Sequence, residues 1–290
     1  MFFQQLVNGI IIGSIYSLIA LGYTMVYGII ELINFAHGEI YMFGAFTGMI
    51  LVGFYDVPFI LALFIAMGLA SMLGLTLDYL AYRPLRRSPR LAALISAIGA
   101  SIFLQNLALL IMGARPYHFP NPITPKLYQT ALFNISRFEI IILFISLSLM
   151  LGLTFLIQKT ATGKAMRATA QDKDTASLMG INVNAIIAIT FIVGSALGAA
   201  AGVLVGVYFR TVTPMMGLMP GLKGFVAAVL GGIGSIPGAM LGGLLLGIAE
   251  TMGAAYISSQ YRDAVAFAIL ILVLFVKPSG LMGKSMQEKI

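Results

Sequence analysis

The chain has 290 residues, of which 60% are hydrophobic and 9% are charged, and its mean hydropathy is +1.00. So few charges could not keep the surface of a soluble domain hydrated, which excludes a soluble globular fold. The absence of cysteine excludes disulfides and thiolate metal sites. We attribute the net charge of +7 to basic loops beside a membrane rather than to an acidic partner, and we expect no nucleic acid to bind.

Repeated apolar runs near the length of a bilayer span predict an all-α polytopic membrane protein. We expect about eight transmembrane helices plus a short or re-entrant helical segment, all within a single transmembrane domain covering residues 1–290. No Lys or Arg precedes the first run, so we expect a permanent span there rather than a cleaved signal. The expected spans are about 5–30, 39–55, 59–82, 91–112, 139–158, 185–209, 237–257 and 263–277, with a shorter segment near 223–233.

Near residues 31–39 the sequence Glu-Leu-Ile-Asn-Phe-Ala-His-Gly-Glu interrupts an apolar run. Ionisable groups inside a membrane are costly and are therefore candidates for function, which selects Glu31, His37 and Glu39 here and Glu250 later in the chain. Two interpretations stay open for this cluster. It lines a pathway, or Asn34 caps the following helix with an acid in its first turn. For Glu250 the alternative to a pathway is a helix-end acid that is paired or faces water.

The loop after the third expected span is strongly basic, with arginines at 83, 86, 87 and 90. We expect it in the cytoplasm, and we expect Arg83 to neutralise Asp78 at the inner end of the span. In the next span Ser101 and Gln105 share a helix face, which either lines a pore or makes hydrogen bonds between helices. The loop 113–138 has fewer basic residues and is expected outside.

A polar insert at 158–184 separates two strongly apolar stretches. Thr162 is expected to cap a helix beginning at Gly163, and Asp172 or Asp174 a second one that stops at Gly180. The insert carries Lys159, Lys164, Arg167 and Lys173, and the tail carries Lys277, Lys284 and Lys289, so both are expected in the cytoplasm. From spacing alone the insert is either a docking element or an ordinary solvated loop.

Glycines spaced four apart follow the insert, at 194, 198, 202 and 206 and again at 234, 238 and 242. They predict close helix packing, with sliding during gating as a compatible function. The proposed topology leaves 35 residues at 223–257 for two passes that need about 40, so one piece must be short or re-entrant. We place the break at 231–238. Broken backbone at membrane depth survives only inside protein or beside a watery cavity, and transporters use it at their pathways.

The candidate pathway residues are Asn34, Phe35, His37, Gly38, Glu39, Ser96, Ser101, Gln105, Gly231, Gly234, Ser235 and Glu250. Because the two histidines are far apart in the sequence and cysteine is absent, we expect no metal site and no other cofactor.

Three motifs together are similar to a known family. Asn34-Phe35-Ala36-His37-Gly38-Glu39 resembles a signature of LivH-type permease subunits of branched-chain amino acid ABC transporters. The segment from Gly163 to Ile181 resembles the ATPase-contacting loop of that family, and 230–239 resembles its glycine-rich signature. The matched coupling residues are Gly163, Lys164, Arg167, Ala168, Ala170, Asp172, Ala176, Gly180 and Ile181. Ala168-Thr169-Ala170 replaces the glutamate-alanine-alanine pattern of importers in general, which leaves the contacting residues open.

This resemblance implies a transport subunit of the bacterial inner membrane that is not itself an enzyme. An external binding protein would deliver a branched-chain or related amino acid, a homologous M-type permease would complete the pathway, and two cytoplasmic ABC ATPase subunits would drive it. The same family leaves urea, short amides and other amino acids open as cargo. A stand-alone secondary transporter or channel would also use intramembrane acids and broken helices, but it would have no need of a docking insert. A scaffold without transport would have no cavity for its costly polar residues to line.

Overall fold

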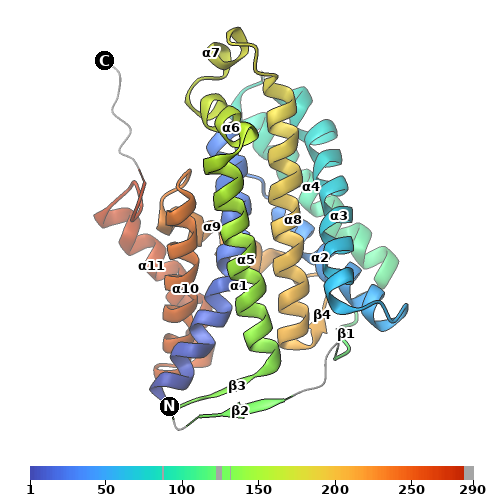
Figure 1. Cartoon of the computed structure of the whole chain (residues 1–290), viewed down its shortest axis with the longest axis vertical. Helices are drawn as coiled ribbons and strands as arrows, with labels where there is room; N and C mark the ends of the chain where they lie inside the picture. Colours follow the sequence, from blue (N-terminus) through green and yellow to red (C-terminus); the bar gives the residue numbers. More distant parts are fainter. Residues whose placement is uncertain (87, 122–125, 131, 284–290) are drawn as a thin grey trace.

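The computed structural model describes residues 1–283 except 87, 122–125 and 131, so the predictions for Arg87, Lys284 and Lys289 lie outside it. The chain is a helical bundle with two small two-stranded ribbons (Figure 1). Its helices are α1 (Phe2–Ile30), α2 (His37–Gly53), α3 (Phe59–Leu77), α4 (Arg90–Met112), α5 (Arg137–Lys159), α6 (Ala161–Gln171), α7 (Lys173–Leu178), α8 (Val183–Phe209), α9 (Leu218–Gly231), α10 (Ile236–Tyr256) and α11 (Arg262–Val276). Antiparallel pairing joins β1 (Tyr117–His118) to β4 (Thr211–Val212) and β2 (Leu127–Gln129) to β3 (Asn134–Ser136).

Seven helices in the described part of the chain are long and apolar enough to cross a membrane. Two further apolar helices are too short for a full span of about 20 residues, since α2 has 17 residues and α9 has 14. Both follow a stretch of irregular backbone, at 31–36 and 213–217. The predicted short segment and the predicted break after residue 30 are therefore confirmed.

The loops gather at two ends of the bundle (Figure 1). We call one the basic end, formed by residues 83–86 and 88–89, by α6 and α7, and by 277–283. Two hydrogen bonds attach parts of this end to the bundle. Arg86 donates to the side chain of Asn184, at the start of α8, at 2.5 Å, and the Leu281 amide donates to the carbonyl of Leu230, at the end of α9, at 2.9 Å. The other is the strand end, with the ribbons, the N-terminus and 257–261. The predicted clustering of the basic segments, opposite to 113–138, is confirmed for the described residues.

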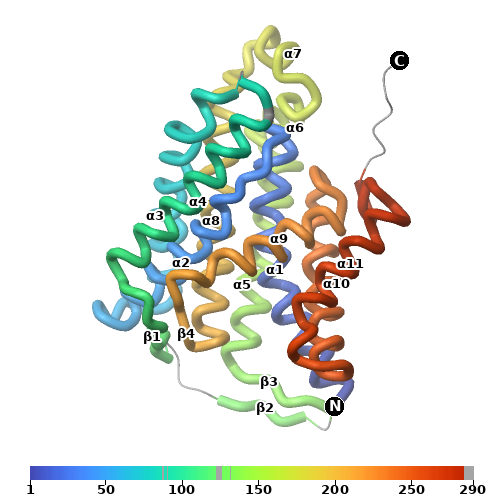
Figure 2. Tube along the Cα trace, turned by 180° about the vertical axis from the view of Figure 1, so that it is seen from behind, coloured from blue at the N-terminus to red at the C-terminus, as the bar shows by residue number. Residues whose placement is uncertain are grey.

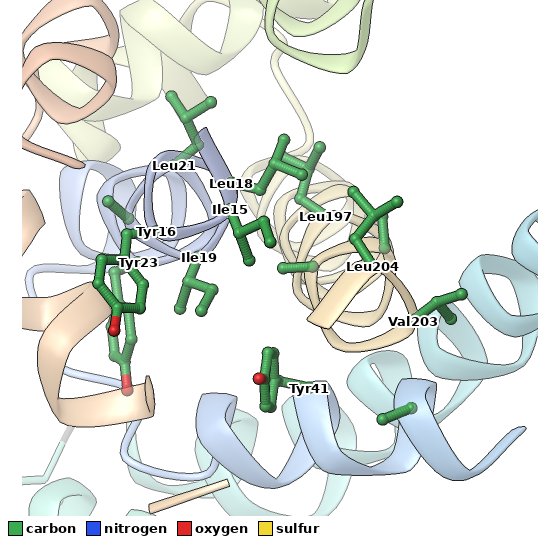
Figure 3. Close-up of a cluster of buried hydrophobic side chains, with 14 of the residues drawn as sticks. Ile15, Tyr16, Leu18, Ile19, Leu21, Tyr23, Tyr41, Leu197, Val203 and Leu204 are labelled. Atoms are coloured by element: carbon green, nitrogen blue, oxygen red, sulfur yellow. The ribbon is translucent and has the colours of Figure 1, made fainter. Parts of the chain in front are cut away.

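α1 lies at the centre of the bundle and is buried along almost its whole length. Figure 3 shows Ile15 and Leu18 of α1 facing Leu197 and Leu204 of α8, with Tyr41 of α2 beneath them. By contrast α4 and α11 have few buried residues, and many of their large apolar side chains are exposed. Such faces suit lipid or a neighbouring subunit rather than water.

Most glycines of the two predicted series lie at close helix contacts, but Gly234 does not, because a Cβ built there would meet nothing within 4 Å. A Cβ added at Gly202 of α8 would overlap the carbonyl of Tyr41 in α2, and one added at Gly243 of α10 would overlap Ser17 in α1. The Ser17 hydroxyl donates to the carbonyls of Met240, at 2.7 Å, and Gly13, at 2.8 Å. Close approach of small residues is how membrane helices gain packing without a hydrophobic driving force.

The two short helices begin beside each other inside the bundle. A Cβ on Gly38, at the start of α2, would overlap the carbonyl of Gly217, and one on Gly221 would lie 3.0 Å from the Cα of Gly38. From this point α9 runs obliquely across the bundle towards the glycine turn before α10 (Figure 2). Two helix N-termini thus meet away from both ends of the molecule, where their dipoles favour negative charge.

Candidate translocation pocket and coupling helices

The Asn34–Glu39 motif forms the break before α2 and its first turn. Ala36 is the N-cap residue of α2 and makes no side-chain cap, so the expected capping by the Asn34 side chain is wrong. The side-chain amide oxygen of Asn34 instead accepts a hydrogen bond from the Tyr82 hydroxyl at 2.9 Å, and the backbone carbonyl of Asn34 accepts one from the His37 amide. Glu39 lies in the first turn of α2 as expected. Buried Tyr82 is thus the partner that sequence spacing did not reveal.

His37 fills a slot between α1 and α8. Its ring is edge-on to Tyr23 at 4.7 Å between centroids. A Cβ on Gly22 would overlap the imidazole, and one on Gly198 would lie 3.0 Å from its Cε1. This histidine packs tightly between glycines and is not among the residues that line the neighbouring pocket.

A pocket of about 160 Å³ opens between α2, α4 and the start of α9. It brings together five of the predicted pathway residues, namely Phe35, Gly38, Glu39, Ser101 and Gln105. The Ser101 hydroxyl donates to Oε1 of Glu39 at 3.2 Å, so the predicted polar face of α4 does meet the motif at 34–39. Apolar side chains of Ile98, Ile102, Leu218 and Leu222 complete the walls with Tyr23. The site is thus mainly apolar with a few converging polar groups.

Ser96 lies elsewhere on α4, where its hydroxyl donates to the Ala81 carbonyl at 2.9 Å. That carbonyl belongs to a π-helical turn (Asp78–Tyr82), which a 3₁₀ turn (Arg83–Leu85) follows. Asp78 is ion-paired with Arg86 at 2.5 Å rather than with Arg83, so the expected partner is wrong. Arg83 instead lies over the Tyr79 ring. These two turns bring Arg86, three residues after Arg83, back towards Asp78.

Glu250 belongs to a buried network of charges. Its Oε1 lies 2.9 Å from Nζ of Lys223 in α9 and 2.7 Å from Nε of Arg262 in α11, and Lys223 also pairs with Asp263 at 2.6 Å. Two acids and two bases balance one another and tie α9, α10 and α11 together. Of the two interpretations for Glu250, the paired acid describes this geometry.

The glycine-rich segment forms the turn between α9 and α10. Gly232 and Gly234 have φ values of 102° and 88°, which favour glycine, and the Ser235 hydroxyl caps α10 by accepting from the Gly238 amide at 3.2 Å. Gly231 packs against Gly238. Gly234 lines a small pocket with Arg167 and Ala170 of α6, and not the pocket at Glu39. The break is where the sequence indicated, and it lies beside the polar insert.

The polar insert folds as two short helices, as predicted. Thr160 caps α6 by accepting from the Gly163 amide at 3.1 Å, so the expected cap at Thr162 is wrong by two residues. A Cβ on Gly163 would overlap the carbonyl of Ile157, and Arg167 donates to the same carbonyl. Glycine is needed because α6 turns sharply off the end of α5. The helix begins earlier than expected because this corner is so tight.

Asp172 caps α7 with hydrogen bonds from the amides of Asp174 and Thr175, both at 2.9 Å. Gly180 ends the helix pair with a φ of 82°. Of the matched coupling residues, Lys164, Arg167, Ala170 and Gly180 are exposed, whereas Gly163 and Ala176 are buried. Lys173 of α7 donates to the carbonyl of Ile30, at the end of α1, at 3.2 Å.

Leu178 and Met179 were missed by the sequence reasoning. Their side chains are 87% and 79% exposed at the tip of α7, in the most polar segment of the basic end. Large apolar side chains presented together to water mark an interaction site. Their position immediately before Gly180, inside a polar insert, was the available indication.

Comparisons with known proteins agree with this architecture. A sequence model of the family described as "Branched-chain amino acid transport system / permease component" matches residues 5–274. The chain is 47% identical to the high-affinity branched-chain amino acid transport system permease protein LivH of Salmonella typhimurium, covering 100% of this chain and 98% of that protein. It is 46% identical to the corresponding protein BraD of Pseudomonas aeruginosa, with the same coverage.

More distant similarities extend the picture. The autoinducer 2 import system permease protein LsrC of Yersinia enterocolitica is 27% identical over 73% of this chain and 58% of that protein. A solved structure, PsaBC from Streptococcus pneumoniae in complex with Fab, superposes with a TM-score of 0.50 at 12% identity, covering 94% of this chain and 91% of that one. At that identity the likeness concerns the fold alone.

The helices of spanning length and the full-length similarity to permeases make this chain a multi-pass protein of the inner membrane. It belongs to the family of permease components of branched-chain amino acid transport systems.

Proposed function

We propose that this chain is the membrane-spanning permease subunit of an ATP-binding-cassette importer that moves branched-chain amino acids into the cytoplasm. The observation that carries the proposal is the helix pair α6–α7, which is capped, anchored and tipped with the exposed Leu178 and Met179. A chain with its own source of energy has no need of such an element. The basic end would face the cytoplasm and the strand end the outside.

The coupling function is supported by how α6 and α7 are attached. Arg167 and Gly163 hold α6 against the end of α5, and Lys173 joins α7 to the end of α1. Arg86 joins the turn before α4 to the start of α8. A push on the tip of α7 would therefore reach several spans at once and tilt them as rigid bodies.

Two cytoplasmic ABC ATPase subunits would supply that push, so ATP hydrolysis would belong to them and not to this chain. An external substrate-binding protein would deliver cargo at the strand end. A homologous M-type permease would pack against the apolar faces that α4 and α11 leave exposed. The whole chain would act as a single transmembrane domain, with residues 158–184 as its coupling loop.

Within the family, other amino acids, urea and short amides remain alternative cargoes. The decisive experiment measures binding-protein-dependent uptake of radiolabelled leucine, isoleucine and valine in cells that carry or lack this chain, with the sister permease and ATPases present in both. We expect uptake to disappear without the chain. Unchanged uptake of all three would contradict the proposed cargo.

A stand-alone transporter is tested by reconstituting the chain alone in liposomes under an ion gradient. We expect no amino acid flux without the ATPase subunits. Gradient-driven flux by the single chain would overturn the importer assignment.

A further inference from the structure

Glu39 is the one carboxylate in the pocket between α2, α4 and α9, and its charge is left uncompensated. The side chain is 1% exposed. Oε1 accepts from the Ser101 hydroxyl at 3.2 Å, but Oε2 has no hydrogen-bond partner among the described residues. No ion pair involves Glu39 in the part of the chain that the structure describes. A buried carboxylate without a partner is costly, so its presence calls for a compensating group from elsewhere.

The free oxygen points towards the start of α9. A Cβ built on Gly217 would lie 2.9 Å from Oε2, which places that oxygen at the wall where α9 begins. The N-termini of α2 and α9 both favour negative charge there. Neither helix end supplies a cation that would occupy the carboxylate.

The other walls of the pocket are of two kinds. Ser101 and Gln105 add hydrogen-bonding side chains one helical turn apart on α4. Phe35, Ile102 and Leu218 add apolar surface. The volume of about 160 Å³ is far above the roughly 15 Å³ that one water molecule needs, so the pocket can admit a small organic group.

We propose that this pocket recognises the α-ammonium group of an amino acid in transit, with Oε2 of Glu39 as its counter-ion. Oxygens of Ser101 and Gln105 would accept its other N–H groups, and the apolar walls would contact the aliphatic side chain. The carboxylate of the amino acid would face the backbone N–H groups at the start of α9, where a negative charge is stabilised. This inference rests on the proposed function and assigns one chemical feature of the cargo to one residue of the permease.

A metal ion fits the pocket less well. Within the described residues no group of three or more His, Asp or Glu side chains is arranged to hold a metal. Ca²⁺ takes six to eight oxygen ligands, whereas this pocket offers one carboxylate, one hydroxyl and one amide. An ammonium group has three N–H donors to place, which matches three acceptors.

The test uses the complete importer reconstituted in proteoliposomes, with Glu39→Gln as the principal variant. We expect leucine uptake to fall by about tenfold or more, since an ammonium–carboxylate contact is a strong charge-assisted hydrogen bond. ATP hydrolysis stimulated by the binding protein should continue. Asp56→Asn is the matched control, because Asp56 is exposed, lies in the turn after α2 and has a φ of 51° that asparagine tolerates. Uptake should be unchanged in that variant.

A second measurement uses only the wild-type protein, so its result does not depend on whether a variant folds. Leucine binding to the detergent-solubilised wild-type complex without its binding protein is followed by saturation-transfer NMR. We expect competition by leucinamide, which keeps the ammonium group, and none by 4-methylpentanoate, which lacks it.

Equal competition by both compounds, or full uptake by Glu39→Gln, would overturn the ammonium site. Failure of the wild-type importer to transport any branched-chain amino acid would instead overturn the proposed function. Uptake by the wild-type importer therefore distinguishes a failure of the ammonium site from a failure of the proposed function.

Discussion

Two glutamates are buried in this bundle, and they have opposite surroundings. Glu250 is 0% exposed and is ion-paired with Lys223 and Arg262. Glu39 is 1% exposed, accepts one hydrogen bond from Ser101 and borders a pocket. Both are costly in the same way, but only Glu250 is compensated by the fold itself. Burial alone therefore does not distinguish the two acids, whereas ion pairing does.

The comparison predicts its largest effect on stability at Glu250. Glu250→Gln would leave Lys223 with Asp263 as its remaining acid and would remove the acid that pairs with Arg262, and breaking a buried pair costs about 3–5 kcal/mol. We expect a clear fall in the Tm of the purified protein. Asp263→Asn is the control, since that side chain is 48% exposed and its contribution should be about 1 kcal/mol or less. Equal falls in both variants would contradict a special role for the buried acid.

A substitution at the tip of α7, like Glu39→Gln, should abolish transport without lowering the stability of the protein. Leu178→Asp places a charge in the proposed ATPase contact, and we expect uptake to fall by about tenfold or more while ATP hydrolysis and Tm stay near wild type. Leu178→Met keeps the apolar surface and should retain uptake. If Leu178→Asp transports normally, the tip of α7 is not the contact.

Gly180 tests the backbone of the same tip. Its φ of 82° is strained for a β-branched residue, so Gly180→Val should distort the end of α7 at a local cost of about 1–3 kcal/mol and reduce coupled uptake. Asparagine adopts this conformation more readily, so Gly180→Asn should be milder. Ala168 is a half-buried residue of α6, and Ala168→Asp, which adds a charge there, should likewise uncouple ATP hydrolysis from uptake. Normal transport by both Gly180→Val and Ala168→Asp would remove the coupling assignment.

The smallest effect is expected at the capping box that starts α5, which belongs neither to the Glu250 network nor to the pocket at Glu39. There Ser136 accepts from the Glu139 amide while the Glu139 carboxylate accepts from the Ser136 amide. Ser136→Ala should cost about 1 kcal/mol of stability, measured as a small fall in Tm. Uptake per folded molecule should not change, and Ser136→Thr should preserve the cap. A large loss of uptake would show that this turn has a second function.

Much of this fold was predictable because the periods and charges that define it are local. Span length located the spanning helices, and the 35 residues at 223–257 are too few for two full spans, which predicted the short helix α9. Both helix breaks fell where the sequence placed them. The polar face of α4 met Glu39 because a spacing of four residues puts Ser101 and Gln105 on one side of a helix.

The failures concern partners chosen by tertiary packing. Asn34 binds Tyr82, 48 residues away, rather than capping its own helix. Asp78 forms its ion pair with Arg86 rather than with Arg83, because a π-helical turn and a 3₁₀ turn lie between them. Nothing in the sequence showed that Glu250 would be paired and Glu39 left unpaired, since the three other charges of the Glu250 network come from α9 and α11.

The most direct test of the distinction between the two acids is a paired measurement on Glu39→Gln and Glu250→Gln. Both replace a buried carboxylate with an amide of the same shape, so Tm and leucine uptake per folded molecule are compared for each. Because Oε2 of Glu39 has no partner to lose, Glu39→Gln should keep its Tm and lose uptake. Glu250→Gln should lose Tm. A Glu39→Gln protein that is as unstable as Glu250→Gln, but transports normally once folded, would contradict the account.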